Sequence, residues 1–325
     1  MAQNNNLHTA KKEKNNEFYT QLEDIEKEMA CYDVSNFQGK VIYCNCDDYR
    51  VSNFCKCFKD NFEYLGIKKV MATNYDIGDG AYKWEYDGEN ETVTELEGNG
   101  GYETEECIAF LKEADVVVTN PPFSLFRDYV KQLMDYGKKF LILGNNNAIT
   151  YKEIFPYIKN NELWLGRTLF TGKMPYFKVP ENYTLENDRY ERRSDGLYKQ
   201  VNGICWFTNI PNDGNREILD LFKKYNPEEY PKYDNYDAIE CGRMIYLPMD
   251  YDGVIGVPIT SLKYLYSDGK IHANIDGVDT KFDILGMAED NGHGFSGAAN
   301  WDGLNPHCVI NGKNMFKRIF ISKLS

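Results

Sequence analysis

Short apolar runs alternate with amphipathic stretches along the first half of the chain. The runs are predicted to be β-strands and span residues 41–44, 68–73, 116–118 and 140–143. Apolar residues recur at helical spacing over 17–30, 51–65, 103–112, 123–136 and 150–158. Strands that are apolar throughout are covered on both faces, and alternation with helices makes neighbouring strands parallel. The pattern therefore predicts an α/β fold with a doubly wound, mostly parallel sheet, whose ligand binds beyond the carboxyl ends of the strands.

The pattern changes after residue 160, where strand-like runs follow one another without helices. Short strand candidates span 163–169, 174–179, 201–208, 243–247, 281–285 and 316–321. Residues 211–325 are rich in Tyr, Gly, Asp and Pro, and we expect them to form an irregular α+β extension of the sheet. The acidic, glycine-rich segment 77–101 alternates over 82–86, which predicts a hairpin.

Three parts follow from this organisation. Residues 1–14 are polar and include Lys11, Lys12 and Lys14, which predicts a mobile basic arm. Residues 15–210 contain the predicted sheet and form the core domain, and residues 211–325 form a C-terminal extension.

Composition narrows the class of protein. With 325 residues, 42% of them apolar and 27% charged, the chain can bury a sizeable core and is neither disordered nor a small disulfide scaffold. It has no apolar run of about eighteen residues, which argues against a membrane span. Residues 1–16 lack the apolar stretch of a secretion signal, and the nine cysteines are odd in number. We therefore expect a cytoplasmic protein with reduced thiols and no membrane partner.

The net charge of −13 is concentrated in one segment. Thirteen acids and two lysines lie between Asp76 and Asp115, a local balance of −11, so the rest of the chain sums to −2. The total charge alone argues against a nucleic-acid partner, but its distribution leaves a basic surface for DNA open elsewhere. The acidic segment itself is predicted to be a solvated hairpin or loop.

The sharpest chemical signal is Asn120-Pro121-Pro122-Phe123, which stands between a buried strand and a helix. Two prolines fix φ and remove two N–H donors, and they bias the residues before them away from the helical region. The result is a rigid elbow at the carboxyl end of a strand. The elbow presents acceptors, namely the Asn120 side-chain oxygen and the Pro121 carbonyl, and few donors.

A pair of acceptors suits an exocyclic amine. Two acceptors can hold both N–H bonds of an sp² amino group and draw its lone pair out of conjugation, while Phe123 stacks on the ring. An adenine in a duplex reaches such a pocket only when it is flipped out. The alternative is a Pro-Pro turn that only begins a helix. The buried strand before the motif and the helix after it favour the functional interpretation.

The elbow resembles the N-P-P-[FYW] signature of the amino-methyltransferases that use S-adenosylmethionine. The segment Asn16-Glu17-Phe18-Tyr19-Thr20 resembles the E-F-Y-T element of many DNA adenine methyltransferases. Six stretches, in order and covering most of the chain, resemble the EcoRI-type adenine-specific DNA methyltransferases: EFYTQLEDIEKE, VIYCNCDDYRVSNF, EECIAFLKEADVVVTNPPFSLF, KKFLILGNNNAITYKEIF, MDYDGVIGVPIT and NGKNMFKRIFIS.

This resemblance implies transfer of a methyl group from S-adenosylmethionine to N6 of a flipped-out adenine in double-stranded DNA. The implied catalytic residues are Asn120, Pro121, Pro122 and Phe123. The implied cofactor residues are Glu17, Phe18, Tyr19, Thr20, Asn45, Cys46, Asp47 and Asp48. The resemblance also implies a sheet of the methyltransferase type, a catalytic core at 15–210 and DNA target recognition by 211–325. A restriction-modification context follows, in which a cognate restriction endonuclease shares the DNA site without forming a physical complex.

Two segments depart from the patterns of related enzymes. Residues 44–48 read Cys-Asn-Cys-Asp-Asp where most methyltransferases have a glycine-rich loop. Residues 98–102 read Gly-Asn-Gly-Gly-Tyr where the family often has G-D-G-D-F. An acidic contact to the adenine of the cofactor is therefore either lost or replaced by a neutral one from Asn99. Asp76, which follows the second predicted strand, is the candidate for the cofactor ribose.

Six basic residues are candidates for contact with DNA phosphates. They are Lys11, Lys12 and Lys14 in the arm, and Arg189, Arg192 and Arg193 in a predicted polar loop. A solvated polar loop is the alternative for each. A metal site is not expected, because the four histidines are scattered and the pairs Cys44/Cys46 and Cys55/Cys57 are separated by one residue rather than the two typical of zinc ligands.

Two other functions are compatible with these signals. The same acceptor geometry serves methylation of RNA adenine or of a protein glutamine. A third hypothesis is a cofactor-binding DNA-binding protein without turnover, which the altered segment at 98–102 motivates. Exchange of substrates in a labelling assay separates DNA methylation from methylation of RNA or protein, and cofactor binding without product supports the DNA-binding protein.

Overall fold

The computed structural model describes residues 20–76, 78–168, 176–179, 189–212, 218–288, 295–296, 308–315 and 317–324. The chain forms two compact units, the first made of Met1–Asn146 and Gly166–Ile210 and the second of Asn147–Leu165 and Pro211–Ser325. The candidate residues Lys11, Lys12, Lys14, Glu17, Phe18 and Tyr19 lie outside the described residues.

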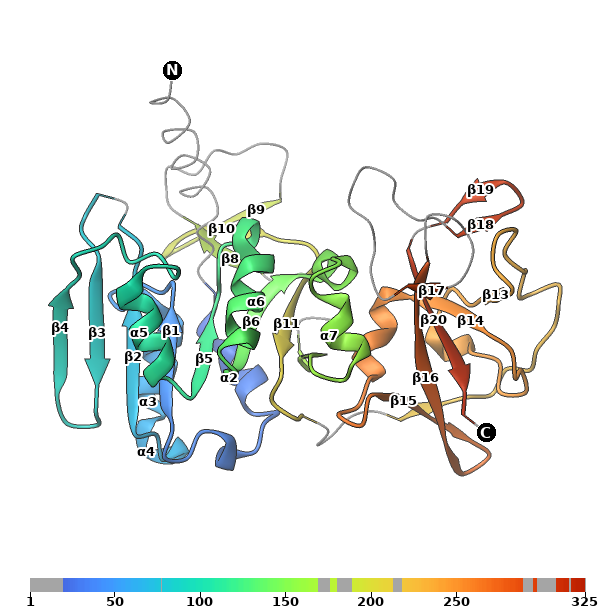
Figure 1. Cartoon of the computed structure of the whole chain (residues 1–325), viewed down its shortest axis with the longest axis horizontal. Helices are drawn as coiled ribbons and strands as arrows, with labels where there is room; N and C mark the ends of the chain where they lie inside the picture. The colour runs from blue at the N-terminus through green and yellow to red at the C-terminus, as the bar shows by residue number, and fades with distance from the viewer. Residues whose placement is uncertain are drawn as a thin grey trace, which may run out of the picture. The chain divides into compact units, whose positions relative to one another are not determined.

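The first unit is built on a large mixed sheet (Figure 1). Its strands are β1 (Val41–Asn45), β2 (Lys69–Thr73), β3 (Tyr82–Tyr86), β4 (Glu91–Glu95), β5 (Val116–Thr119), β6 (Lys139–Asn145) and β11 (Ile204–Thr208). They lie in the order β4-β3-β2-β1-β5-β6-β11. Strands β2, β1, β5 and β6 are parallel to their neighbours in this group. At one end β3 and β4 add antiparallel strands next to β2, and at the other β11 pairs antiparallel with β6. The mixed α/β character is confirmed, and parallel pairing is confined to the four central strands.

The helices of this unit begin and end at residues whose chemistry explains the boundaries. They are α2 (Leu22–Met29), α3 (Asn53–Asp60), α4 (Phe62–Leu65), α5 (Glu105–Glu113) and α6 (Phe126–Asp135), with the 3-10 turns η1 (Val34–Asn36) and η2 (Phe123–Leu125). The Ser52 hydroxyl begins α3 by accepting hydrogen bonds from the first turn, and the Thr104 hydroxyl does the same for α5. Gly66, at a φ of 62°, ends α4.

Both faces of the parallel strands are buried. Ile42 and Cys44 of β1 pack in one apolar cluster with Phe54 of α3. Tyr43, which stands between them in the sequence, is also fully buried, as is Tyr129 of α6. Because successive strand residues point to opposite faces, β1 has apolar cover on both sides. This explains why residues 41–44 are all apolar instead of alternating with polar ones.

The predicted acidic hairpin is present as β3 and β4, which extend the sheet beyond β2 (Figure 1). Trp84 of β3 is buried, and its Nε1 donates a hydrogen bond to Glu91 (3.2 Å). Every residue of β4 is exposed, including Glu91 and Glu95. Charged side chains on an exposed edge strand oppose pairing with another chain.

A separate antiparallel sheet in the first unit corrects one prediction. It consists of β8 (Tyr176–Val179), β9 (Tyr190–Arg193) and β10 (Gly196–Gln200) in the order β8-β10-β9. The polar loop predicted around Arg189, Arg192 and Arg193 is therefore wrong, because Arg192 and Arg193 belong to β9. Residues 194–195 form a tight turn into β10, and main-chain pairing, rather than apolar character, makes the segment a strand.

The second unit contains another mixed sheet, in the order β12-β15-β16-β20-β14-β13, with β17 paired to β16. Its elements are β7 (Trp164–Leu165), β12 (Leu219–Asp220), β13 (Ile239–Glu240), β14 (Ile255–Pro258), β15 (Lys270–Ile275), β16 (Val278–Ala288), β17 (Phe295–Ser296), β18 (Val309–Ile310), β19 (Lys313–Asn314), β20 (Arg318–Lys323), α7 (Phe155–Lys159), η3 (Asn146–Thr150), η4 (Met244–Tyr246) and η5 (Ile259–Tyr264).

Two predicted elements differ in this unit. The strand expected at 243–247 is the 3-10 turn η4, in which Met244 and Leu247 are buried three positions apart, the spacing of such a turn. The helix expected at 150–158 begins only at Phe155. Pro156 explains the late start, because proline lacks an N–H and fits the first turn of a helix.

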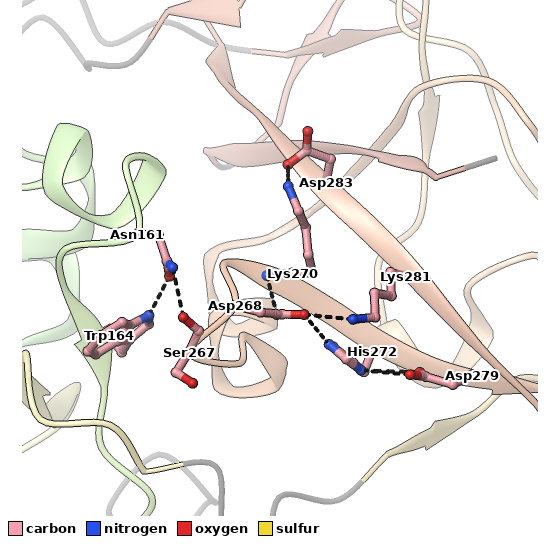
Figure 2. Close-up of polar contacts among 9 residues, drawn as sticks. All are labelled: Asn161, Trp164, Ser267, Asp268, Lys270, His272, Asp279, Lys281 and Asp283. Atoms are coloured by element: carbon pink, nitrogen blue, oxygen red, sulfur yellow. Dashed lines mark hydrogen bonds and ion pairs between the residues drawn. The ribbon is translucent and has the colours of Figure 1, made fainter.

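Polar contacts join the segment before β7 to the hairpin of β15 and β16 (Figure 2). Asn161 donates a hydrogen bond from Nδ2 to the Ser267 carbonyl (2.7 Å) and accepts one from Trp164 Nε1 (2.8 Å). On the hairpin itself, Asp268 contacts both His272 Nε2 (2.9 Å) and Lys281 Nζ (2.8 Å). The bond from Asn161 to Ser267 joins the two pieces of the second unit, and the other contacts order the side chains within each piece.

In the part of the chain that the structure describes, no helix has the length and apolar character needed to cross a membrane. Nor do three or more His, Cys, Asp or Glu side chains gather there in an arrangement suited to a metal ion. The expectation that the protein needs no metal stays a prediction.

Candidate active site

The carboxyl ends of three neighbouring parallel strands meet at one edge of the first sheet. β2 ends at Thr73, β1 at Asn45 and β5 at Thr119. The Thr73 hydroxyl donates a hydrogen bond to Asn45 Oδ1 (3.2 Å), and the Thr119 hydroxyl contacts the main-chain oxygen of Asn45. In open α/β sheets, ligands bind at this kind of edge.

Asp47 joins the loop after β1 to the elbow after β5. Its carboxyl accepts a hydrogen bond from the Ser52 hydroxyl (2.7 Å) and contacts the Thr119 hydroxyl. The carboxyl also accepts a hydrogen bond from the main-chain N–H of Asn120. The main-chain N–H of Asp47 donates to the Thr73 carbonyl (3.0 Å). One residue thus connects the ends of β2, β1 and β5.

The electrostatic state of Asp47 reflects its burial. The side chain is 9% exposed, and burial raises the pKa of the carboxyl to about 7. Hydrogen bonds from Thr119, Ser52 and Asn120 act in the opposite direction, because they stabilise the ionised form. With this pKa, both the protonated and the ionised forms of Asp47 are populated near neutral pH.

The elbow Asn120-Pro121-Pro122-Phe123 leads from β5 into η2 and α6. Pro122 lies at φ −56° and ψ 126°, and its carbonyl accepts a hydrogen bond from Leu125 (3.0 Å). Pro121 is buried, whereas Asn120, Pro122 and Phe123 are half-buried. Phe123 packs against the apolar cluster that covers one face of the sheet. The core therefore holds the elbow without enclosing it.

The glycine-rich segment that replaces an acidic one packs beside the end of β2. The main-chain N–H of Asp76 donates to the Asn99 carbonyl (2.9 Å), and Gly100 lies against the main-chain oxygen of Asn74. The Asp76 carboxyl accepts a hydrogen bond from the Gly78 main chain (2.7 Å), which lowers its pKa. The two candidate cofactor residues Asp76 and Asn99 are therefore direct neighbours.

Comparisons with known proteins assign the family. The sequence profile of Adenine-specific methyltransferase EcoRI matches residues 6–323. Over 284 residues the chain is 45% identical to the Type II methyltransferase M.EcoRI of Escherichia coli, which covers 80% of this chain and 86% of that protein. Over 258 residues it is 42% identical to the Type II methyltransferase M.MpnI of Mycoplasma pneumoniae, with coverage of 78% and 80%.

The chain belongs to the EcoRI family of adenine-specific methyltransferases. The resemblance inferred from the sequence motifs is thereby confirmed. No solved structure matches the chain.

Cys46, in the loop after β1, has a backbone conformation that is usually found at glycine. Its φ of 71° lies in the left-handed region, which favours glycine. The loop therefore keeps a backbone that glycine adopts easily, although the sequence 44–48 contains no glycine. Burial raises the pKa of the Cys46 thiol well above its ordinary value, so the thiol stays protonated at neutral pH.

Substitutions at Cys46 are expected to follow backbone strain. Cys46→Gly relieves the strain of the left-handed backbone. We expect its free energy of unfolding to equal that of the wild type or to exceed it by up to about 1 kcal/mol. Cys46→Val adds a β-branched side chain at the same φ and is expected to lower it by about 1–2 kcal/mol. Cys46→Asn is the control, because asparagine tolerates this region. Urea unfolding of the three variants measures the order, and a valine variant as stable as the glycine variant contradicts it.

Gly100 offers a test of the segment around Asn99. A Cβ at Gly100 would overlap the main-chain oxygen of Asn74, so Gly100→Ala is expected to displace Asn99 from Asp76. We expect the affinity for S-adenosylhomocysteine to fall on the order of 10-fold, since displaced loops lose preorganised contacts. Gly39→Ala is the matched control, because Gly39 has the same φ of 71° with nothing within 4 Å. Equal losses in the two variants, measured by titration calorimetry, would show that only backbone strain is at work.

The remaining candidate cofactor residues lie near the first-strand loop. Asp48 forms an ion pair with Arg50 (2.7 Å) and accepts a hydrogen bond from its main-chain N–H (2.9 Å). Thr20 is buried, and its carbonyl accepts a hydrogen bond from Asn53 Nδ2 (2.7 Å) at the beginning of α3. Thr20 is therefore bonded to the helix that follows the loop. Asp48 is held by its ion pair with Arg50.

The candidate DNA-contacting arginines lie on the separate sheet of the first unit. Arg193 pairs with Glu191 (3.2 Å), and its guanidinium lies 4.1 Å from the centre of the Tyr198 ring. Arg189 and Arg192 are exposed. Because neighbouring residues of a strand point to opposite faces, Arg192 and Arg193 do not present one continuous basic face.

Sequence reasoning missed three hydroxyl residues of the site: Thr73, Thr119 and Ser52. Each contacts the first-strand loop through its hydroxyl. A signal was present for Ser52, since serine before an apolar helical stretch is typical of a helix start. Thr73 and Thr119 carried no local signal, because their role depends on strands that are adjacent in space and distant in sequence.

Proposed function

We propose that this chain is a site-specific DNA adenine methyltransferase of the restriction-modification type, which transfers a methyl group from S-adenosylmethionine to N6 of an adenine flipped out of double-stranded DNA. The observation that carries the proposal is the half-buried elbow Asn120–Phe123 at the carboxyl end of β5, tied through Asp47 to the loop after β1. The family assignment supports the same conclusion.

The residues around the first-strand loop fit a cofactor of this kind. Asn45 Nδ2 and Thr20 Oγ1 are buried polar atoms without a hydrogen-bond partner among the described residues. Such atoms cost free energy unless a ligand or water satisfies them, and the carboxylate, ammonium and hydroxyl groups of S-adenosylmethionine can do so. In this proposal Thr20, Asn45, Cys46, Asp48, Asp76 and Asn99 line the cofactor site, with Glu17, Phe18 and Tyr19 before them, and Asp47 supports the loop from within.

The cofactor supplies an activated methyl group on a sulfonium. On the protein side, Asn120 Oδ1 and the Pro121 carbonyl accept both N–H bonds of the target amine and stabilise the positive charge that develops on N6. Pro122 keeps the elbow rigid, and Phe123 stacks on the base. Positioning supplies the remaining rate enhancement, and the departing N6 proton is held by these acceptors until it passes to water.

The two units take different roles in this proposal. The parallel strands β2, β1, β5 and β6 with their helices represent the doubly wound sheet of the S-adenosylmethionine-dependent methyltransferases, and residues 15–210 are the catalytic core. The second unit, mainly residues 211–325, is the extension that recognises the DNA target. Lys11, Lys12, Lys14, Arg189, Arg192 and Arg193 contact phosphates, and a restriction endonuclease that shares the DNA site is the functional counterpart.

Direct examination of cellular DNA tests this function. DNA from cells that express the protein is digested with methylation-sensitive restriction enzymes and sequenced for modified adenine. We expect modified adenine at one recurring sequence, absent from cells that express Asn120→Ala. In a parallel labelling assay, methyl transfer to RNA or protein but not DNA favours the alternative substrates. Cofactor binding without product favours a DNA-binding protein without turnover.

A further inference from the structure

Asp47 has contacts that differ from those of a cofactor ligand. Its carboxyl contacts the hydroxyls of Ser52 and Thr119 and the main-chain N–H of Asn120. A carboxylate offers about four lone-pair positions, and three are used by these donors. At 9% exposure the side chain is also withdrawn from the surface of the loop. The protein itself therefore satisfies most of the hydrogen-bonding capacity of Asp47.

We propose that Asp47 is a positioning residue for methyl transfer, which sets the orientation of Asn120 and Pro121 by holding the elbow against the loop after β1. The inference rests on the proposed function and assigns Asp47 a role other than direct contact with S-adenosylmethionine. The Asn120 N–H belongs to the same residue whose side-chain oxygen receives the target amine. A shift of its peptide plane therefore moves both acceptors of the elbow together.

The hydrogen bonds of the Thr119 hydroxyl depend on whether Asp47 is protonated. Thr119 Oγ1 contacts both the Asn45 carbonyl and the Asp47 carboxyl, but a hydroxyl has a single proton to donate. When Asp47 is protonated, its O–H donates to Thr119, and Thr119 donates to the carbonyl. When Asp47 is ionised, the hydroxyl turns to the carboxylate, and the bond from the Asn120 N–H becomes charge-assisted and stronger.

Activity is therefore expected to rise with pH as Asp47 loses its proton. Burial raises the pKa of Asp47 to about 7, which places this change between pH 6 and pH 8. Among the described residues, the charges of Asp48, Cys46, Cys44 and Tyr129 interact with Asp47. Burial raises the pKa of the two thiols and of the Tyr129 hydroxyl well above their ordinary values, so these three stay neutral in this range.

The experiment compares Asp47→Asn and Asp47→Ala with the wild-type full chain. The measurements are kcat on duplex DNA at saturating S-adenosylmethionine and the dissociation constant of S-adenosylhomocysteine. For Asp47→Ala we expect kcat to fall on the order of 10–100-fold, since a small misplacement of reacting groups is that costly. The dissociation constant is expected to change by less than about 3-fold in both variants, since neither removes a cofactor contact.

Asp47→Asn keeps the shape of the side chain and removes its ionisation. With its oxygen at the position of Oδ1 it still accepts from Ser52, and its NH₂ at the position of Oδ2 donates to Thr119. We expect kcat within about 10-fold of wild type and no rise between pH 6 and pH 8, because no charge-assisted bond forms. This pH profile decides the role even if Asp47→Ala does not fold. Thr119→Ser, which keeps the hydroxyl, and Thr119→Val, which removes it, are the matched pair, and only the valine variant is expected to lose activity.

Two outcomes overturn the inference. The first is a loss of S-adenosylhomocysteine affinity of more than about 10-fold in Asp47→Asn with kcat unchanged. Asp47 would then contribute to cofactor binding and not to the methyl-transfer step. The second is an Asp47→Asn variant that keeps the wild-type rise with pH. If the wild-type chain transfers no methyl group to DNA, the proposed function fails instead, and the affinity for S-adenosylhomocysteine still decides whether Asp47 contacts the cofactor.

Discussion

Replacement of Asn120 by alanine is expected to lower the rate of methyl transfer on the order of 100–1,000-fold. This is the loss seen when one preorganised group that stabilises transition-state charge is removed. Asn120 follows the carboxyl end of β5 with a half-buried side chain. In the proposed mechanism this side chain is one of the two acceptors for the target amine. Single-turnover transfer of a labelled methyl group to duplex DNA, at saturating cofactor and DNA, measures the effect.

The control for Asn120→Ala separates chemistry from folding. Asn120→Asp keeps an acceptor oxygen at the same position and is expected to retain more activity than the alanine variant. Both variants are expected to bind S-adenosylhomocysteine with an affinity within about 3-fold of wild type, because the elbow accepts the base rather than the cofactor. Full activity in Asn120→Ala would remove the elbow from the mechanism.

The largest effect on stability is expected in the second unit, at the ion pair between Arg318 and Glu240. Arg318 is 8% exposed and Glu240 is 9% exposed, and the guanidinium donates to Glu240 Oε1 at 2.7 Å. The Tyr233 hydroxyl also donates to Glu240. Burial raises the pKa of Tyr233, with the Glu240 charge as the next cause. These groups link β20, β13 and the segment before β13.

Arg318→Ala is expected to lower the free energy of unfolding by about 3–5 kcal/mol, because the buried Glu240 charge loses its partner. The paired replacement Arg318→Met with Glu240→Leu removes both charges and is expected to cost less than the single substitution. Because the chain has two units, hydrogen exchange at β14 and β20 is a better measurement than one global transition. A single variant no less stable than the paired one would contradict the account.

The sequence pattern predicts the central sheet for a physical reason. The strands β1, β5 and β6 are covered on both faces, so their central residues are apolar, and each run stands out from the alternating pattern of strands with one exposed face. The left-handed Gly66 at the end of α4 and the alternation in β3 are equally local signals. The elbow is predictable because two prolines restrict the backbone whatever surrounds them.

The elements that were predicted wrongly lack such local signals. β9 is polar, and it is a strand because its main chain pairs with β10. The run 243–247 is apolar enough for a strand, yet burial of Met244 and Leu247 at a spacing of three selects a 3-10 turn. Antiparallel pairing of β11 with β6 likewise depends on a neighbour that is distant in sequence.

The candidate site shows the same division between local and distant information. The candidate residues around β1 and β5 could be identified from motifs, and the resemblance to one family implies their roles. The connection between them could not, because Asp47 and Thr119 are 72 positions apart and meet only when β1 and β5 pair. This contact joins the loop after β1 and the elbow after β5 in one hydrogen-bonded network.

The most direct test of the central claim identifies the methylated atom. Duplex DNA is incubated with the full chain and methyl-labelled S-adenosylmethionine, digested to nucleosides and examined by mass spectrometry. The account predicts that the label resides in N6-methyldeoxyadenosine and that the Asn120→Ala variant produces almost none. Label in a methylated cytosine, or DNA left unlabelled while the cofactor is bound, would contradict it.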